Sequence, residues 1–139
     1  MKNEYLQNIK KNNSLFKNCI SCNAPPGYNS KIKDFVMWLE EFNKKNKSDI
    51  CITQIKMKFG FLTIYVEDAA ISKDEKHPVF GLESDLVHKV YEKIAELCYE
   101  VQQICNVCGK PLVETVRDSK IVMICFDHFK QNFVHFRRR

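Results

Sequence analysis

The sequence predicts an α+β fold in which two amphipathic helices flank a β-hairpin, and three patterns support this. Residues 32–42 place apolar side chains at intervals of three and four, the period of one helix face. Residues 50–66 instead alternate apolar and polar side chains, the period of a half-buried strand. Residues 82–104 return to the helical period and sustain it over about six turns. With 139 residues, the chain has the length of one domain.

The N-terminal elements are less strongly specified. Residues 3–13 are polar with a few apolar positions, which predicts a short helix. Residues 16–28 contain two cysteines and the breaker run Ala24-Pro25-Pro26-Gly27, so we expect an irregular loop. Ser30 is the expected cap of the next helix, and the polar run from Asn43 to Ser48 is expected to end that helix as a solvated connection.

The central segments predict how the core is built. The apolar phase slips between Ile52 and Ile55, which indicates a β-bulge, and Gly60 is the expected turn of the hairpin. Residues 68–81 are polar and charged, so we expect a flexible link. We expect Trp38 to share one core with the hairpin and the long helix. The apolar stripe of that helix consists of Leu86, Val90, Ile94, Leu97, Val101 and Ile104.

Cysteine spacing near the C-terminus predicts a metal site. The chain has seven cysteines, an odd number that fits metal ligation better than a complete set of disulfides. Cys105 and Cys108 are separated by two residues, and so are Cys125 and His128. A hairpin between the two pairs would bring them together around one zinc ion. Three thiolates and one imidazole fill a tetrahedral shell, so we expect one structural zinc rather than a catalytic one.

The order of knuckle, hairpin and helix around these ligands is that of a treble-clef zinc finger. The hairpin is expected at residues 112–117 and 121–125, with a helix from Phe126 onward. We therefore expect residues 1–104 to form an α+β core and residues 105–139 to form a zinc finger packed on the same core. His135 is an alternative fourth ligand, although its distance from Cys125 favours a surface position.

The remaining cysteines carry weaker signals. Cys51 and Cys98 have apolar neighbours and are expected to be small buried residues. Cys19 and Cys22 leave two interpretations open, a metal or redox role and free thiols that line a loop. His88 lies in the middle of the long predicted helix, where we expect a solvated histidine or one with its hydrogen bonds satisfied.

Several classes of function lack their sequence signals. With four glycines, the chain contains no phosphate-binding loop, and no nucleophile stands beside a base, so we expect no enzymatic activity, no catalytic residue and no small-molecule substrate. No apolar run is long enough for a membrane helix, and the N-terminus lacks the pattern of a secretory signal. These observations predict a cytoplasmic protein.

The sequence also resembles a family of small, largely uncharacterised bacterial and phage-encoded proteins. The residues that carry the resemblance are Cys22 with Gly27-Tyr28, the segment Lys58-Phe59-Gly60-Phe61-Leu62-Thr63-Ile64-Tyr65-Val66, and the C-terminal cysteine and histidine pairs. That family has a cysteine and a Gly-Trp before the helix, a KFGGLR strand followed by two aromatic residues and valine, and a CxxCG…CxxH zinc finger. The chain departs from it at Tyr28, Phe61 and Thr63, so a role that needs the family's arginine does not transfer.

Charge is strongly segregated along the chain, which bears on the class of partner. Residues 1–60 carry eleven lysines against five acidic residues, whereas residues 61–104 carry four lysines against nine acidic residues. Such segregation suits electrostatic docking to another protein. We therefore expect this chain to be an immunity protein or a phage-encoded inhibitor, and its partner to be a toxin or a host factor. The alternative is a nucleic-acid-binding zinc finger protein that uses the lysine-rich residues 1–60 and the tail Arg137-Arg138-Arg139.

Overall fold

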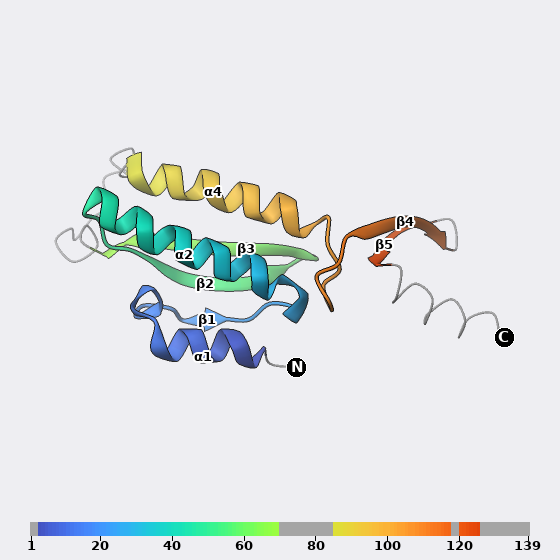
Figure 1. Ribbon diagram of the computed structural model, residues 1–139, viewed down its shortest axis with the longest axis horizontal. Helices are drawn as coiled ribbons and strands as arrows, with labels where there is room; N and C mark the ends of the chain where they lie inside the picture. Colours follow the sequence, from blue (N-terminus) through green and yellow to red (C-terminus); the bar gives the residue numbers. More distant parts are fainter. Residues whose placement is uncertain (1–2, 70–84, 118–119, 126–139) are drawn as a thin grey trace.

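The computed structural model describes residues 3–69, 85–117 and 120–125 (Figure 1). These residues confirm an α+β fold, built from three α-helices, a three-stranded sheet and a separate two-stranded hairpin. The helices are α1 (Glu4–Asn12), α2 (Asn29–Asn46) and α4 (Asp85–Val101), and two short 3-10 turns are η1 (Ser14–Phe16) and η2 (Pro26–Tyr28). The strands are β1 (Ser21–Cys22), β2 (Ile50–Lys58), β3 (Phe61–Asp68), β4 (Leu112–Arg117) and β5 (Lys120–Cys125).

The three-stranded sheet has the order β1-β2-β3 and is mixed. Strands β2 and β3 form the predicted antiparallel hairpin, and their register shifts between Ile52 and Gln54, which confirms the bulge. Strand β1 pairs parallel to β2 and lies inside the segment expected to be an irregular loop, so that expectation is wrong there. A strand of two residues is too short to show an alternating pattern in the sequence. It forms because a partner strand far along the chain pairs with it.

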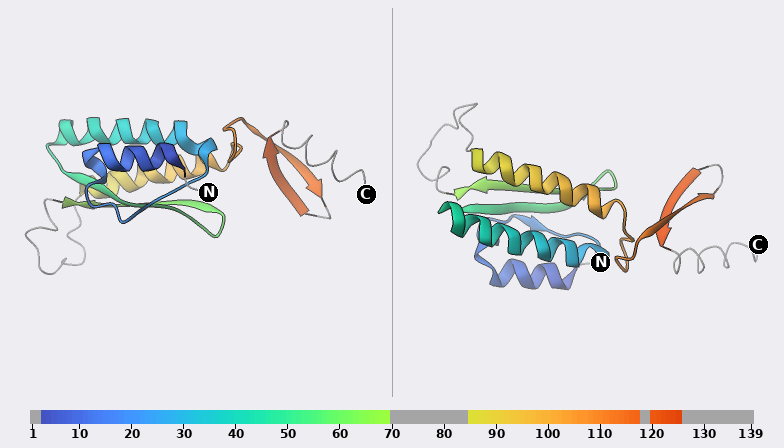
Figure 2. Two further views of the ribbon diagram at one scale, coloured as in Figure 1. Left: turned by 90° about the horizontal axis from the view of Figure 1, so that it is seen from below. Right: turned by 45° about the horizontal axis from the view of Figure 1, so that its top comes forward.

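The core lies between the sheet and the helices. Figure 2 (left) shows the strands along one border of the molecule with α1, α2 and α4 on the same side of them. The largest fully buried side chains include Phe35 and Leu39 of α2, Ile52 and Ile55 of β2, and Val90 of α4. Trp38 packs partly buried against this cluster and stacks on Phe42, with ring centroids 4.9 Å apart. The two amphipathic helices and the hairpin therefore share one core, as predicted.

The boundaries of α2 differ from those expected. The helix begins at Asn29, and its N-cap residue Tyr28 makes no side-chain capping bond, so Ser30 lies within the first turn and is not the cap. The helix continues to Asn46 through most of the run expected to be a solvated connection.

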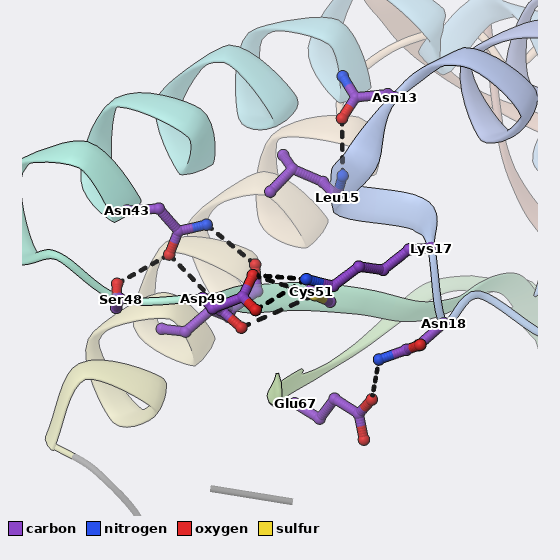
Figure 3. A network of polar contacts seen from close by, with 10 residues as sticks. Asn13, Leu15, Lys17, Asn18, Asn43, Ser48, Asp49, Cys51 and Glu67 are labelled. Carbon is purple, nitrogen blue, oxygen red and sulfur yellow. Dashed lines mark hydrogen bonds and ion pairs between the residues drawn. The ribbon is translucent and has the colours of Figure 1, made fainter. Parts of the chain in front are cut away.

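Asn43 explains why that run is ordered. Its side-chain oxygen accepts hydrogen bonds from the Ile50 N–H at 3.1 Å and the Ser48 hydroxyl at 2.8 Å, and its amide donates to the Ile50 carbonyl at 3.0 Å (Figure 3). One side chain thus joins the last turns of α2 to the start of β2.

The β2–β3 turn consists of two residues with left-handed backbone angles. Gly60 has φ +83°, and Phe59, which carries a side chain, has φ 54°. Two residues with positive φ fit the tight hairpin turn whose twist matches that of the flanking strands.

Some predicted elements lie wholly or partly outside the described residues. These are most of the 68–81 link, the first three residues of the predicted 82–104 helix and the C-terminal helix from Phe126 onward. Where α4 is described, it ends at Val101, because residues 102–104 lead by a turn into the cysteine knuckle.

Candidate metal centre

The hairpin β4–β5 brings Cys125 back to the first cysteine pair. Its register places Leu112 opposite Cys125, so the end of β5 lies beside the segment that follows Cys108. The Sγ atoms of Cys105, Cys108 and Cys125 all lie within 4.8 Å of one another, and those of Cys108 and Cys125 are 3.5 Å apart. Three of the four predicted ligands therefore converge on one point.

Backbone hydrogen bonds shape the loop of residues 105–109, which we call the knuckle. The Cys105 N–H donates to the Lys110 carbonyl at 2.7 Å, and the Gly109 N–H donates to the Cys105 carbonyl at 2.8 Å. Gly109 has φ +78°, a conformation that favours glycine. The Val107 N–H points at the Cys105 sulfur, 3.4 Å away. The knuckle thus directs both of its thiols to the same side.

The surroundings of Cys105 favour its thiolate, which is the form that binds metals. Burial by itself raises the pKa of this thiol. Hydrogen bonds from the backbone N–H groups of Cys108 and Val107, and from the thiols of Cys125 and Cys108, outweigh burial and lower the pKa to about 6. Cys105 and Cys125 are buried, whereas Cys108 is exposed at the edge of the cluster.

The sulfur geometry fits a metal ion. With Zn–S bonds of about 2.3 Å, the sulfurs of a tetrahedral site lie about 3.8 Å apart, close to the separations within this cluster. A group of three cysteines can therefore hold a metal ion with little rearrangement. His128, the predicted fourth ligand, lies outside the described residues, and so does the alternative, His135.

The knuckle packs directly on the loop before α2 through a close glycine contact. The Gly27 N–H donates to the Asn106 carbonyl at 2.8 Å. A Cβ atom on Gly27 would lie 2.2 Å from the Cys105 carbonyl oxygen and 2.6 Å from the Asn106 carbonyl carbon. The sequence indicated a chain breaker at Gly27 and a match to the Gly-Trp of the resembled family, but one glycine after two prolines gives no sign of a distant backbone contact. Glycine is required here by the approach of the knuckle.

An open pocket of about 350 Å³ joins the knuckle to the hairpin turn. Its lining includes Tyr28, Phe61, Ile104, Cys105 and Leu112. Burial, with the nearby Cys105 thiolate as a second cause, raises the pKa of Tyr28. The aromatic end of the β2–β3 hairpin is therefore a neighbour of the knuckle.

The other cysteines do not join this cluster. Cys51 is fully buried, and the half-buried Cys98 donates its thiol hydrogen to the Leu62 carbonyl at 3.2 Å. The Cys22 thiol lowers the pKa of Cys19 to about 7 by hydrogen bonding, against burial, while the same interaction together with burial raises the pKa of Cys22. In the described ranges, neither of these two belongs to a group of three or more potential metal ligands. His88 is exposed on α4, as expected.

Comparison with known proteins adds no relative. No protein-family model, curated protein or solved structure matches this chain, so the resemblance to the small bacterial and phage-encoded family stays a prediction. Among the residues that the structure places, no helix combines the length and the apolar character needed to cross a membrane.

Proposed function

We propose that Cys105, Cys108, Cys125 and His128 bind one structural zinc ion in a treble-clef finger. The convergence of three sulfurs from a knuckle and a hairpin supports this, since both elements occur in that order in a treble clef. Thiolates are soft ligands that favour zinc over magnesium or calcium. Four protein ligands leave no position for a substrate, so the role of the ion is to hold the C-terminal residues together.

Metal analysis of the purified protein and three variants tests this proposal. We expect one zinc per chain in the wild type, loss of the metal in Cys108→Ser, and weaker binding in His128→Ala. Cys98→Ser is the matched control, because this half-buried thiol lies on α4 outside the cluster, and it should retain full zinc content. If protein purified without chelator contains no zinc, the proposed zinc site is wrong. If His128→Ala binds zinc with unchanged affinity, the assignment of His128 as the fourth ligand is wrong.

We propose further that the protein acts by binding another macromolecule and not by catalysis. The observation that supports this is an exposed sheet face with aromatic and basic side chains, on the side of the sheet away from the helices. Exposed apolar side chains that gather on one surface, rimmed by polar residues, mark interaction sites. A closed metal site is consistent with this function, because such an ion contributes to stability alone.

Because charge is segregated along the chain, we propose that the partner is a protein, such as a toxin or a host factor. The acidic contact residues of this chain would be Asp74, Glu75 and Glu83, which lie outside the described residues, so the proposal rests on the sequence. Reversing all three to lysine should slow association with a captured partner and leave the melting temperature nearly unchanged, because exposed charges contribute little to stability. Unaltered association rates in the reversed variant would exclude this surface. The second candidate partner is nucleic acid, and the aromatic and basic side chains on the exposed sheet face favour it.

A further inference from the structure

The β2–β3 hairpin has one face that none of the described helices α1, α2 and α4 covers. Alternation and register place six residues on it, namely Gln54, Lys56 and Lys58 on β2 opposite Tyr65, Thr63 and Phe61 on β3. The residues between them, such as Ile55, Leu62 and Ile64, are buried under the helices. We call these six residues the open face. Figure 2 (left) shows the hairpin with the helices on its opposite side.

The open face exposes aromatic rings. Phe61 is 55% exposed and Tyr65 is 37% exposed, although burial in a core is the usual position of such rings. The two residues are four positions apart on β3, which corresponds to about 14 Å along a strand. Each ring is therefore free to stack on its own flat ligand group, with Thr63 between them.

Phe59 extends this aromatic surface at the hairpin turn. Its side chain is 91% exposed, so it gains almost nothing from packing. Its backbone has φ 54°, a conformation that costs a residue with a β-carbon about 1 kcal/mol and that asparagine or glycine adopts more easily. Stability does not account for a phenylalanine at this position. Because strained backbone conformations cluster at binding and active sites, Phe59 is a candidate contact residue.

Positive charge accompanies the rings. Lys58 is opposite Phe61 and Lys56 is opposite Thr63 in the register, so both lysines alternate with the aromatic positions. Neither lysine takes part in any of the ion pairs found within the described ranges. The acidic residues of the hairpin, Glu67 and Asp68, lie at its other end. The end of the open face near the turn is therefore basic and aromatic.

This combination favours nucleic acid over protein as the ligand. The buried centres of protein interfaces are enriched in aromatic residues but depleted in lysine. Grooves that bind single strands combine lysines for the phosphates with exposed rings on which unpaired bases stack. We propose that the open face, together with Phe59, binds single-stranded nucleic acid. This inference rests on the proposed function in macromolecular binding and assigns it a site and a partner class.

Fluorescence anisotropy with labelled oligo-uridine and oligo-thymidine tests the site. Phe61→Ala and Tyr65→Ala should each weaken binding about 5- to 150-fold, the range measured for one base stacked on one ring. The double variant Lys56→Ala/Lys58→Ala should reduce the slope of log affinity against log salt by about 1.4, because each phosphate contact with a single strand contributes about 0.7.

Matched control variants separate this site from general effects. Tyr99→Ala removes a ring that is 67% exposed on α4, and Lys44→Ala/Lys45→Ala removes two exposed charges of α2. All of these controls should bind like the wild type, and circular dichroism should show that every variant is folded. A duplex competitor should be at least about 10-fold weaker than a single strand, since stacking requires unpaired bases.

The possible outcomes distinguish a failure of the open face as the binding site from a failure of the proposed function in macromolecular binding. If the wild type binds neither oligonucleotide, the inference is wrong, while a protein partner mapped by cross-linking would still satisfy the proposed function. If the open-face variants bind as tightly as the wild type, nucleic-acid binding holds, but another surface, such as Arg137-Arg138-Arg139, is responsible. Equal competition by duplex overturns the stacking mechanism.

Discussion

The helix-covered sheet and the knuckle are stabilised in different ways. The first region buries apolar side chains from α1, α2, α4 and the sheet in one cluster. The knuckle has few such side chains to bury, since Val107, its one large aliphatic residue, is 55% exposed. Its conformation depends on backbone hydrogen bonds and on the convergence of three sulfurs. The core is therefore stabilised by burial, whereas the knuckle depends on backbone hydrogen bonds and, under our proposal, on a bound cation.

Removal of the proposed zinc ion should have the largest effect and should separate the two regions. A structural zinc site contributes about 10 kcal/mol of binding free energy, so we expect the knuckle and the β4–β5 hairpin to lose protection after chelation. Hydrogen exchange should show fast exchange at residues 105–125 and persistent protection in α2 and α4. Loss of protection throughout the chain would show that the helix-covered sheet also depends on the ion.

Leu97→Ala should show the opposite pattern. Leu97 is buried in the core, and its truncation should reduce the free energy of unfolding by about 2–5 kcal/mol through lost contacts and a cavity. Zinc affinity of the folded protein should stay the same. Tyr99→Ala on the exposed side of α4 is the control and should change stability by at most about 0.5 kcal/mol. Chemical denaturation measures both values, and equal effects in the two variants would contradict the core assignment.

Gly27→Ala tests the contact between the two regions. The added methyl group would overlap the Cys105 and Asn106 backbone, so we expect a loss of about 1–3 kcal/mol together with weaker zinc binding. Gly60→Ala is the matched variant, because it introduces backbone strain at φ +83° but meets no atom within 4 Å. It should cost about 1–2 kcal/mol and leave zinc affinity unchanged. Zinc titration of both variants measures the difference. Equal zinc affinities would mean that the knuckle does not depend on Gly27.

Phe59→Asn should have the smallest effect on stability, and in the favourable direction. Asparagine followed by glycine suits a tight hairpin turn, so we expect a gain of up to about 1 kcal/mol in the free energy of unfolding. Binding of oligo-uridine should weaken at the same time, because one exposed ring is lost. A variant that gains stability and binds normally would remove Phe59 from the proposed surface while leaving Phe61 and Tyr65 in place.

Local patterns in the sequence predicted much of the fold, and distant contacts account for what they missed. The spacing of apolar residues that predicts α2, α4 and the β2–β3 hairpin with its bulge can be read within a short segment of sequence. The spacing of Cys105, Cys108 and Cys125 predicted their convergence, because a hairpin of fixed length joins them. Strand β1 and the role of Gly27 were missed, since each depends on a partner far away in the chain. The open face was also missed, because aromatic residues in an alternating strand are expected in a core.

The contact between Gly27 and Asn106 has a consequence for biosynthesis. Residue 106 leaves the ribosome about 80 residues after Gly27, which corresponds to several seconds at about 5–20 residues per second. During that interval α2, the β2–β3 hairpin and α4 are synthesised, while the loop before α2 has no knuckle to pack on. Contacts between residues so far apart in the chain carry a loop-closure cost that slows folding. The N-terminal loop therefore cannot reach its final packing until the knuckle has been synthesised.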